Sequence, residues 1–110
     1  MICEIVTFPA AAGASREEIV EDARHVVARW QGEKELVRKH FVWSDDRTTL
    51  KGIYFWNSRA AAEAAHSEEW LQQAEKRIGT RPTIDYFDAF MIIDNAAGSV
   101  TEYPENEVGA

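Results

Sequence analysis

The chain has 110 residues, a length that fits one domain with a hydrophobic core but leaves much of the surface exposed in a monomer. Hydrophobic residues make up 45% and charged residues 28%, which is typical of folded globular proteins. Nineteen acidic residues against twelve basic ones give a net charge of −7, which argues against nucleic acid or an anionic membrane as a partner.

The β-branched and aromatic residues of 2–8, ICEIVTF, predict a first strand, and the Pro and Gly that follow predict a loop. This region shows neither the basic start nor the long apolar stretch of a signal peptide, so we expect a cytoplasmic protein with no membrane span. Cys3 lies within the strand and has no Cys or His at ligand spacing, so we expect a buried thiol and no metal site.

A helix is predicted to begin at Ser15, because S-R-E-E forms a capping box between Ser15 and Glu18. Gly32 stands where this helix is expected to end. Its apolar residues fall on one face at the 3.6-residue period: Ile19, Ala23, Val26, Val27 and Trp30. His25 lies away from that face and is expected to contact solvent.

Two strand-like runs, 36–44 and 49–56, flank the turn residues DDR and predict a β-hairpin. A three-residue turn would pair even positions with even positions and place His40 opposite Gly52. Ser58 and Ser67 then predict the starts of two helical pieces, which end at Gly79.

A last strand is predicted over 84–93, and the remaining residues are acidic and polar. We therefore expect one domain over 1–95 and an acidic carboxyl-terminal tail over 96–110. The order β-α-β-β-α-β is that of the ferredoxin-like α+β fold, with a four-stranded antiparallel sheet and both helices on one face. Both sides of the predicted hairpin carry apolar residues, so we expect a homodimer in which a second sheet covers the open face.

The chain resembles the dimeric α+β barrel superfamily, most closely its YdhR-like monooxygenases. The resemblance is carried by K-G-I-Y-F-W at 51–56, N-S-R-A-A-A-E-A-A-H-S-E-E-W at 57–70 and D-Y-F-D-A-F-M-I-I-D-N at 85–95. It implies a ferredoxin-like monomer, a dimeric barrel and an apolar pocket between sheet and helices. In related barrels such pockets oxidise polycyclic phenols or quinols with dioxygen and without metal or flavin.

In the related antibiotic-biosynthesis monooxygenases, a His commonly follows the strand-ending Trp at a spacing that falls here on Ala65, one position before His66. A helical count places His66 on the face opposite the alanines, so we expect it in solvent unless a bend at Ser67 turns it inward. The residues that haem-degrading relatives use are absent at Thr7, Ala65 and Glu75, which excludes that activity.

The predicted register would bring a base, a cation and a phenol to one sheet face: His40, Arg38 and Tyr54. His40 could remove a phenolic proton, and Arg38 could stabilise the resulting anion. An ordinary sheet histidine is an equally good interpretation of His40. The expected substrate-binding residues are Trp56, Gly52, Ala65, Trp70 and Tyr86.

We therefore expect a monooxygenase without a cofactor, which oxidises a small hydroxylated aromatic of the quinol or polycyclic phenol type. Its partners would be dioxygen, the aromatic molecule and a second copy of the chain. The alternative is a non-catalytic dimeric barrel that binds a small apolar ligand or serves as an interaction scaffold.

Overall fold

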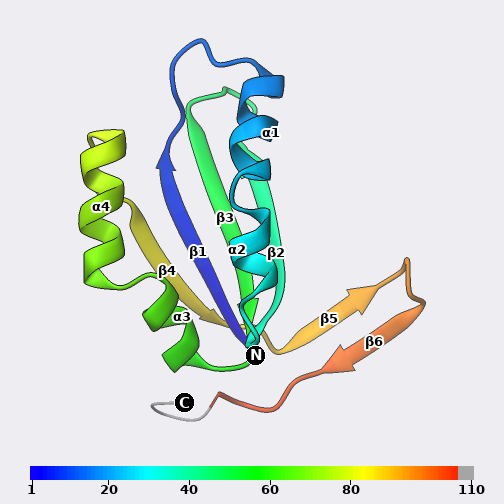
Figure 1. Ribbon diagram of the computed structural model, residues 1–110. Helices are drawn as coiled ribbons and strands as arrows, with labels where there is room; N and C mark the ends of the chain where they lie inside the picture. The colour runs from blue at the N-terminus through cyan, green and yellow to red at the C-terminus, as the bar shows by residue number, and fades with distance from the viewer. Residues whose placement is uncertain (107–110) are drawn as a thin grey trace.

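The computed structural model of the protein describes residues 1–106 and shows helices on one face of a four-stranded antiparallel sheet (Figure 1). The strand order is β2-β3-β1-β4, so the two central strands are distant in sequence. The strands are β1 (Ile2–Pro9), β2 (Leu36–Trp43), β3 (Thr49–Trp56) and β4 (Thr83–Asp88). The predicted ferredoxin-like α+β fold is confirmed.

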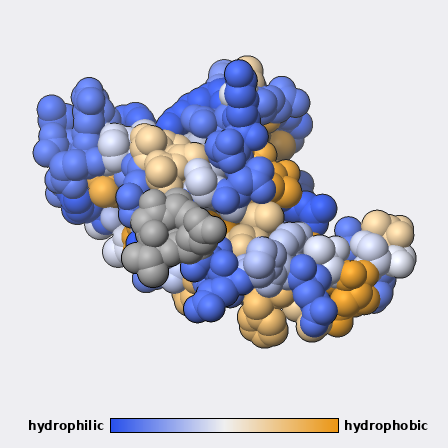
Figure 2. Space-filling view, turned by 90° about the horizontal axis from the view of Figure 1, so that it is seen from below, coloured by the Kyte–Doolittle hydropathy of each residue, from blue (hydrophilic) through white to orange (hydrophobic). Residues whose placement is uncertain are grey.

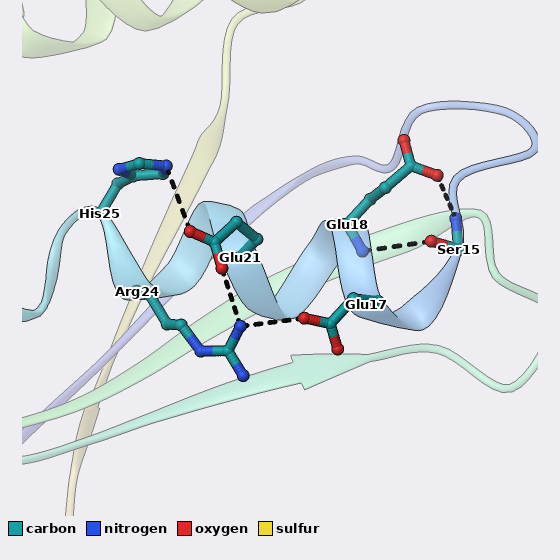
Figure 3. A network of polar contacts seen from close by, with 6 residues as sticks. All are labelled: Ser15, Glu17, Glu18, Glu21, Arg24 and His25. Carbon is teal, nitrogen blue, oxygen red and sulfur yellow. Dashed lines mark hydrogen bonds and ion pairs between the residues drawn. The ribbon is translucent and has the colours of Figure 1, made fainter.

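The first helix begins with the predicted capping box: Glu18 N donates to Ser15 Oγ, and Ser15 N donates to Glu18 Oε1 (Figure 3). Helix α1 (Arg16–Arg24) is followed by a break and by α2 (Val27–Gln31), so the predicted single helix is two. The break allows Trp30 to enter the core, whereas α1 buries no residue.

Ser58 and Ser67 cap α3 (Arg59–Ala65) and α4 (Glu68–Ile78), as the sequence predicts. Each hydroxyl accepts a hydrogen bond from the backbone three residues later. Gly79 ends α4 in the left-handed conformation with φ 88°. Among residues 1–106, no helix has the length and apolar character needed to cross a membrane.

The predicted last strand is interrupted after β4, where Ala89 N donates to Met1 O. The chain continues as β5 (Met91–Asp94) and turns back as β6 (Ser99–Glu102), a hairpin that extends away from the main sheet (Figure 1). Gly98 supplies the left-handed conformation of its turn. Part of the predicted tail is therefore a strand, and residues 107–110 of that tail lie outside the described residues.

The core lies between the sheet and the helices, because alternate residues of β1 and β3 point toward them. Ile2, Glu4 and Val6 are buried on β1, and Tyr54 and Trp56 are buried on β3. Cys3 points to the opposite face and is half-buried rather than buried, and burial there raises the pKa of its thiol.

Candidate functional site

A cleft of about 860 Å³ lies between the helices and the sheet. Its floor comes from β1, β2 and β3, and its walls come from α1, α2 and α4. Apolar side chains dominate its lining, among them Val6, Phe8, Ile19, Val26, Trp30, Phe41, Trp43, Leu50, Tyr54 and Trp70. The volume of the cleft lies within the range of small-molecule pockets in proteins.

Lys39 is the charged residue of this lining whose amine lies among three aromatic rings. Its Nζ lies 4.3 Å from the ring centroid of Trp30, 4.0 Å from Phe41 and 4.6 Å from Tyr54. Burial and the positive charge of Arg29 lower the pKa of Lys39 to about 7, while the negative charge of Glu4 opposes the shift. The aromatic faces also favour the ammonium form, so the amine can exist in both protonation states near neutral pH.

Lys39 occupies this position because the hairpin register differs from the predicted one. Four residues, 45–48, connect the strands, since Ser44 N donates to Thr49 O and Trp43 pairs with Leu50. Asp46 Oδ1 holds this turn by accepting from Thr48 N and from the hydroxyls of Ser44 and Thr48. A loop with an even number of residues pairs odd positions with even ones.

The prediction that His40 and Arg38 share a face with Tyr54 is therefore wrong. His40 pairs with Ile53, and Arg38 pairs with Phe55, on the sheet face without helices. Both side chains are exposed, and the His40 ring lies 6.4 Å from that of Phe55. Lys39 stands opposite Tyr54 instead.

The ring of Tyr54 lies over Gly52, which explains why position 52 has no side chain. A Cβ at position 52 would lie 2.7 Å from Tyr54 Cε1 and 3.0 Å from its hydroxyl oxygen. The space that a side chain at position 52 would need is thus occupied by the phenol ring. Burial and the nearby charge of Glu4 raise the pKa of Tyr54, so its hydroxyl stays protonated at neutral pH.

Beside Tyr54, the paired residue on β1 is Glu4, whose buried side chain links this strand to the segment that joins α3 and α4. Glu4 Oε1 accepts from Trp56 Nε1 at 3.0 Å and lies 2.8 Å from His66 Nδ1. Glu4 and His66 have no side-chain exposure, and Glu4 Oε2 and His66 Nε2 have no hydrogen-bond partner within residues 1–106. The imidazole lies edge-on to Tyr54 and Trp70, with ring centroids 4.7 and 4.6 Å apart.

The burial of His66 contradicts the helical count. Helix α3 ends at Ala65, and His66 has φ −120° and ψ 57°, so it leaves the helical path. The bend that precedes Ser67 turns the ring of His66 into the core. A bend at this position was the one condition under which the sequence allowed an inward His66. Ala65 is also buried, and its carbonyl accepts from Arg29.

The other predicted residues divide between cleft and core. Trp70 and Gly52 line the cleft together with Tyr54. Trp56 is fully buried and holds Glu4 rather than lining the cleft. Tyr86 packs against the core under the guanidinium of Arg59, whose Cζ lies 4.0 Å from the ring centroid.

Sequence reasoning missed Lys39, Glu4 and the inward position of His66. Alternation contained a signal for the first two: Lys39 shares a strand side with Phe41, and Glu4 shares one with Val6. No comparable signal exists for His66, because its orientation depends on where α3 ends. Within residues 1–106, His, Cys, Asp and Glu side chains form no group of three that could hold a metal ion.

The fold and the cleft define an α+β protein with a ferredoxin-like sheet and a largely apolar cleft under its helices. No protein-family model matches the chain, and no curated protein matches it. Its architecture is similar to that of a monooxygenase from the gene ActVA-Orf6 of Streptomyces coelicolor, solved in complex with nanaomycin D. The two are 21% identical with a TM-score of 0.63, over 84% of this chain and 89% of that one.

Two further solved structures share the architecture. One is an antibiotic biosynthesis monooxygenase, 16% identical with a TM-score of 0.59, over 81% of this chain and 98% of that one. The other is PA3566 from Pseudomonas aeruginosa, 22% identical with a TM-score of 0.56, over 78% of this chain and 90% of that one. At these identities the likeness shows the shared fold.

Proposed function

We propose that the protein is a cofactor-independent monooxygenase of the YdhR-like kind, which oxidises a planar hydroxylated aromatic with dioxygen in the cleft. The observation that carries this proposal is Lys39, an amine surrounded by three aromatic rings in an apolar cleft. The fold shared with structures described as monooxygenases supports the same reaction class.

Lys39 takes the role that the sequence suggested for His40. An amine with a pKa of about 7 is substantially neutral at physiological pH and can accept a phenolic proton. The ammonium that forms lies beside the new anion and stabilises it in a site of low polarity. Tyr54, which remains protonated, can donate a hydrogen bond to the same oxygen.

The reaction balances without an external reductant when the substrate is an anthrone and reacts through its phenol tautomer. Lys39 removes the hydroxyl proton, and the anion passes an electron to dioxygen. The radical pair joins to form a C–O bond, and the ammonium of Lys39 protonates the peroxide.

Neutral Lys39 then removes the remaining proton from that carbon. The O–O bond breaks, a carbonyl forms, and the expelled hydroxide takes the proton back from Lys39 as water. The net change is CH₂ plus O₂ giving C=O plus H₂O, so the substrate supplies all four electrons that dioxygen accepts.

A second copy of the chain belongs to this proposal, because apolar surface lies outside the helical layer. Phe87 and Val42 are exposed on the sheet face without helices, where Ile53 and Phe55 are half-buried. The β5–β6 hairpin also exposes large apolar residues, and Figure 2 shows hydrophobic side chains gathered on this projecting part.

Oxygen uptake with anthrone and quinol substrates tests the activity. We expect uptake above a heat-denatured control for the wild type, and a decrease of ~10²- to 10⁴-fold for Lys39→Met, the range that a general base contributes. Lys39→Arg should lose as much rate, because a guanidinium cannot accept a proton at neutral pH.

His40→Ala is the matched control, because His40 lies on the opposite sheet face. It should retain wild-type uptake. Absence of oxygen uptake with every substrate would favour the non-catalytic ligand-binding barrel, and wild-type uptake by Lys39→Met would remove Lys39 from the mechanism.

A further inference from the structure

The cleft gathers positive charge in a chain that is acidic overall. Five basic side chains line it against one acidic residue, Asp22, although the chain carries nineteen acidic and twelve basic residues. The five are Arg16, Arg29, Lys39, Arg47 and Arg77. Lys51 also borders the cleft, but strand alternation directs its side chain to the other sheet face.

None of these five cations lies within ion-pair distance of an Asp or Glu side chain of residues 1–106. Three of the four arginines outside the cleft, Arg24, Arg59 and Arg81, each pair with a glutamate, and within residues 1–106 Arg38 does not. Within residues 1–106, the five cations of the cleft are thus unpaired, while the ion pairs of Arg24, Arg59 and Arg81 lie outside it.

Three of the cleft arginines come from one end of the fold. Arg16 begins α1, Arg47 lies in the turn between β2 and β3, and Arg77 lies in the last turn of α4. Figure 1 shows that these three segments meet the same end of the sheet, at the top of the view. Arg47 is held there by Trp43, since its Cζ lies 4.1 Å from the ring centroid.

A cleft with apolar walls concentrates the field of such charges and attracts an anion. Guanidinium groups match the geometry of a carboxylate, which can accept two parallel hydrogen bonds from each. Phe41, 49% of which is exposed, offers aromatic surface to a ring system beside these charges, whereas Trp30 and Tyr54 are buried.

We propose that the cleft binds a planar aromatic carboxylate, with its ring system against Phe41 and its carboxylate toward Arg16, Arg47 and Arg77. This inference rests on the proposed function in that it names the class of the aromatic substrate. The hydroxyl to be oxidised would then lie at Lys39, away from the arginine end.

The test compares two ligands of the same shape, anthraquinone-2-carboxylate and anthraquinone-2-carboxamide. Each is titrated into the protein while tryptophan fluorescence or binding heat is measured. We expect the carboxylate to bind roughly tenfold more tightly, the effect of a few exposed ion pairs, and this preference to shrink as salt rises to about 0.5 M.

A double variant tests whether the arginine end of the cleft causes the preference for the carboxylate. Arg47→Gln/Arg77→Gln should reduce the preference to about twofold. Arg24→Gln/Arg81→Gln removes the same two charges outside the cleft and should keep the wild-type preference. Circular dichroism confirms that each variant is folded.

Equal affinity for carboxylate and carboxamide overturns the inference, as does saturation by neither ligand at millimolar concentration. An equal loss of preference in both double variants also overturns it, because net charge rather than the arginine end would be responsible. Anthraquinones are already oxidised, so binding is measured without turnover. A charge preference without oxygen uptake therefore refutes only the proposed oxidation, and uptake without a preference refutes only this inference.

Discussion

Lys39 makes the rate of the proposed reaction depend on pH. The amine accepts a proton only in its neutral form, and its pKa is about 7. We therefore expect kcat/KM to rise about tenfold per pH unit below pH 7 and to level off above it. Tyr54, which faces Lys39 from β3, stays protonated across this range because burial raises its pKa.

The measurement is oxygen uptake at low substrate concentration between about pH 5 and pH 9. Lys39→Arg should show a low and flat profile, because arginine remains protonated throughout. A profile that falls as pH rises through 7, or one that Lys39→Arg leaves unchanged, would assign the titrating base to another group.

The pair of Glu4 and His66 should contribute strongly to stability. His66→Ala removes a contact at 2.8 Å and leaves a fully buried carboxylate with Trp56 Nε1 as its remaining partner. Leaving a buried polar group without its hydrogen-bond partner typically lowers the free energy of unfolding by ~1–3 kcal/mol. Urea denaturation at neutral pH measures the change.

His25→Ala is the control for that measurement. His25 has 74% of its side chain exposed and lies 3.7 Å from Glu21 on the solvent side of α1 (Figure 3). Its replacement should change the free energy of unfolding by less than about 0.5 kcal/mol. Similar losses for the two histidines would mean that the buried pair adds little to the stability of the fold.

At the scale of elements, the sequence predicted the starts of the helices correctly, because these depend on interactions between residues close together in the chain. Ser15, Ser58 and Ser67 mark helix starts because each hydroxyl satisfies a nearby backbone amide, and all three caps are present. The order of strands and helices follows from these caps and from alternation along the strands. The ferredoxin-like fold could therefore be predicted from the sequence.

The site was harder to predict because it depends on register and on exact helix ends. One additional residue in the turn at Asp46 moves His40 to one sheet face and Lys39 to the other. The position of His66 depends in the same way on a helix that ends one residue before it. Propensity and periodicity do not fix either boundary to a single residue.

At the scale of the whole molecule, the exposed apolar surface of the β5–β6 hairpin requires an explanation. Ile93 and Val100 stand opposite each other across the hairpin, with exposed fractions of 66% and 65%. Phe90, just before β5, is 72% exposed. Monomeric proteins rarely expose such neighbouring groups, and a second copy of the chain would cover them.

We expect the wild type to have twice the chain mass of 12.5 kDa by light scattering at micromolar concentration. Ile93→Lys/Val100→Lys should shift the protein to the monomeric mass, because burying two ammonium groups without partners is costly. Val27→Lys changes an exposed valine on α2, outside the proposed interface, and should leave the dimer intact. A monomeric wild type would refute the homodimer, and a dimeric double variant would exclude the hairpin from its interface. In that second case the sheet face around Phe55 and Phe87 would have to supply the ~800 Å² per partner that a stable interface buries.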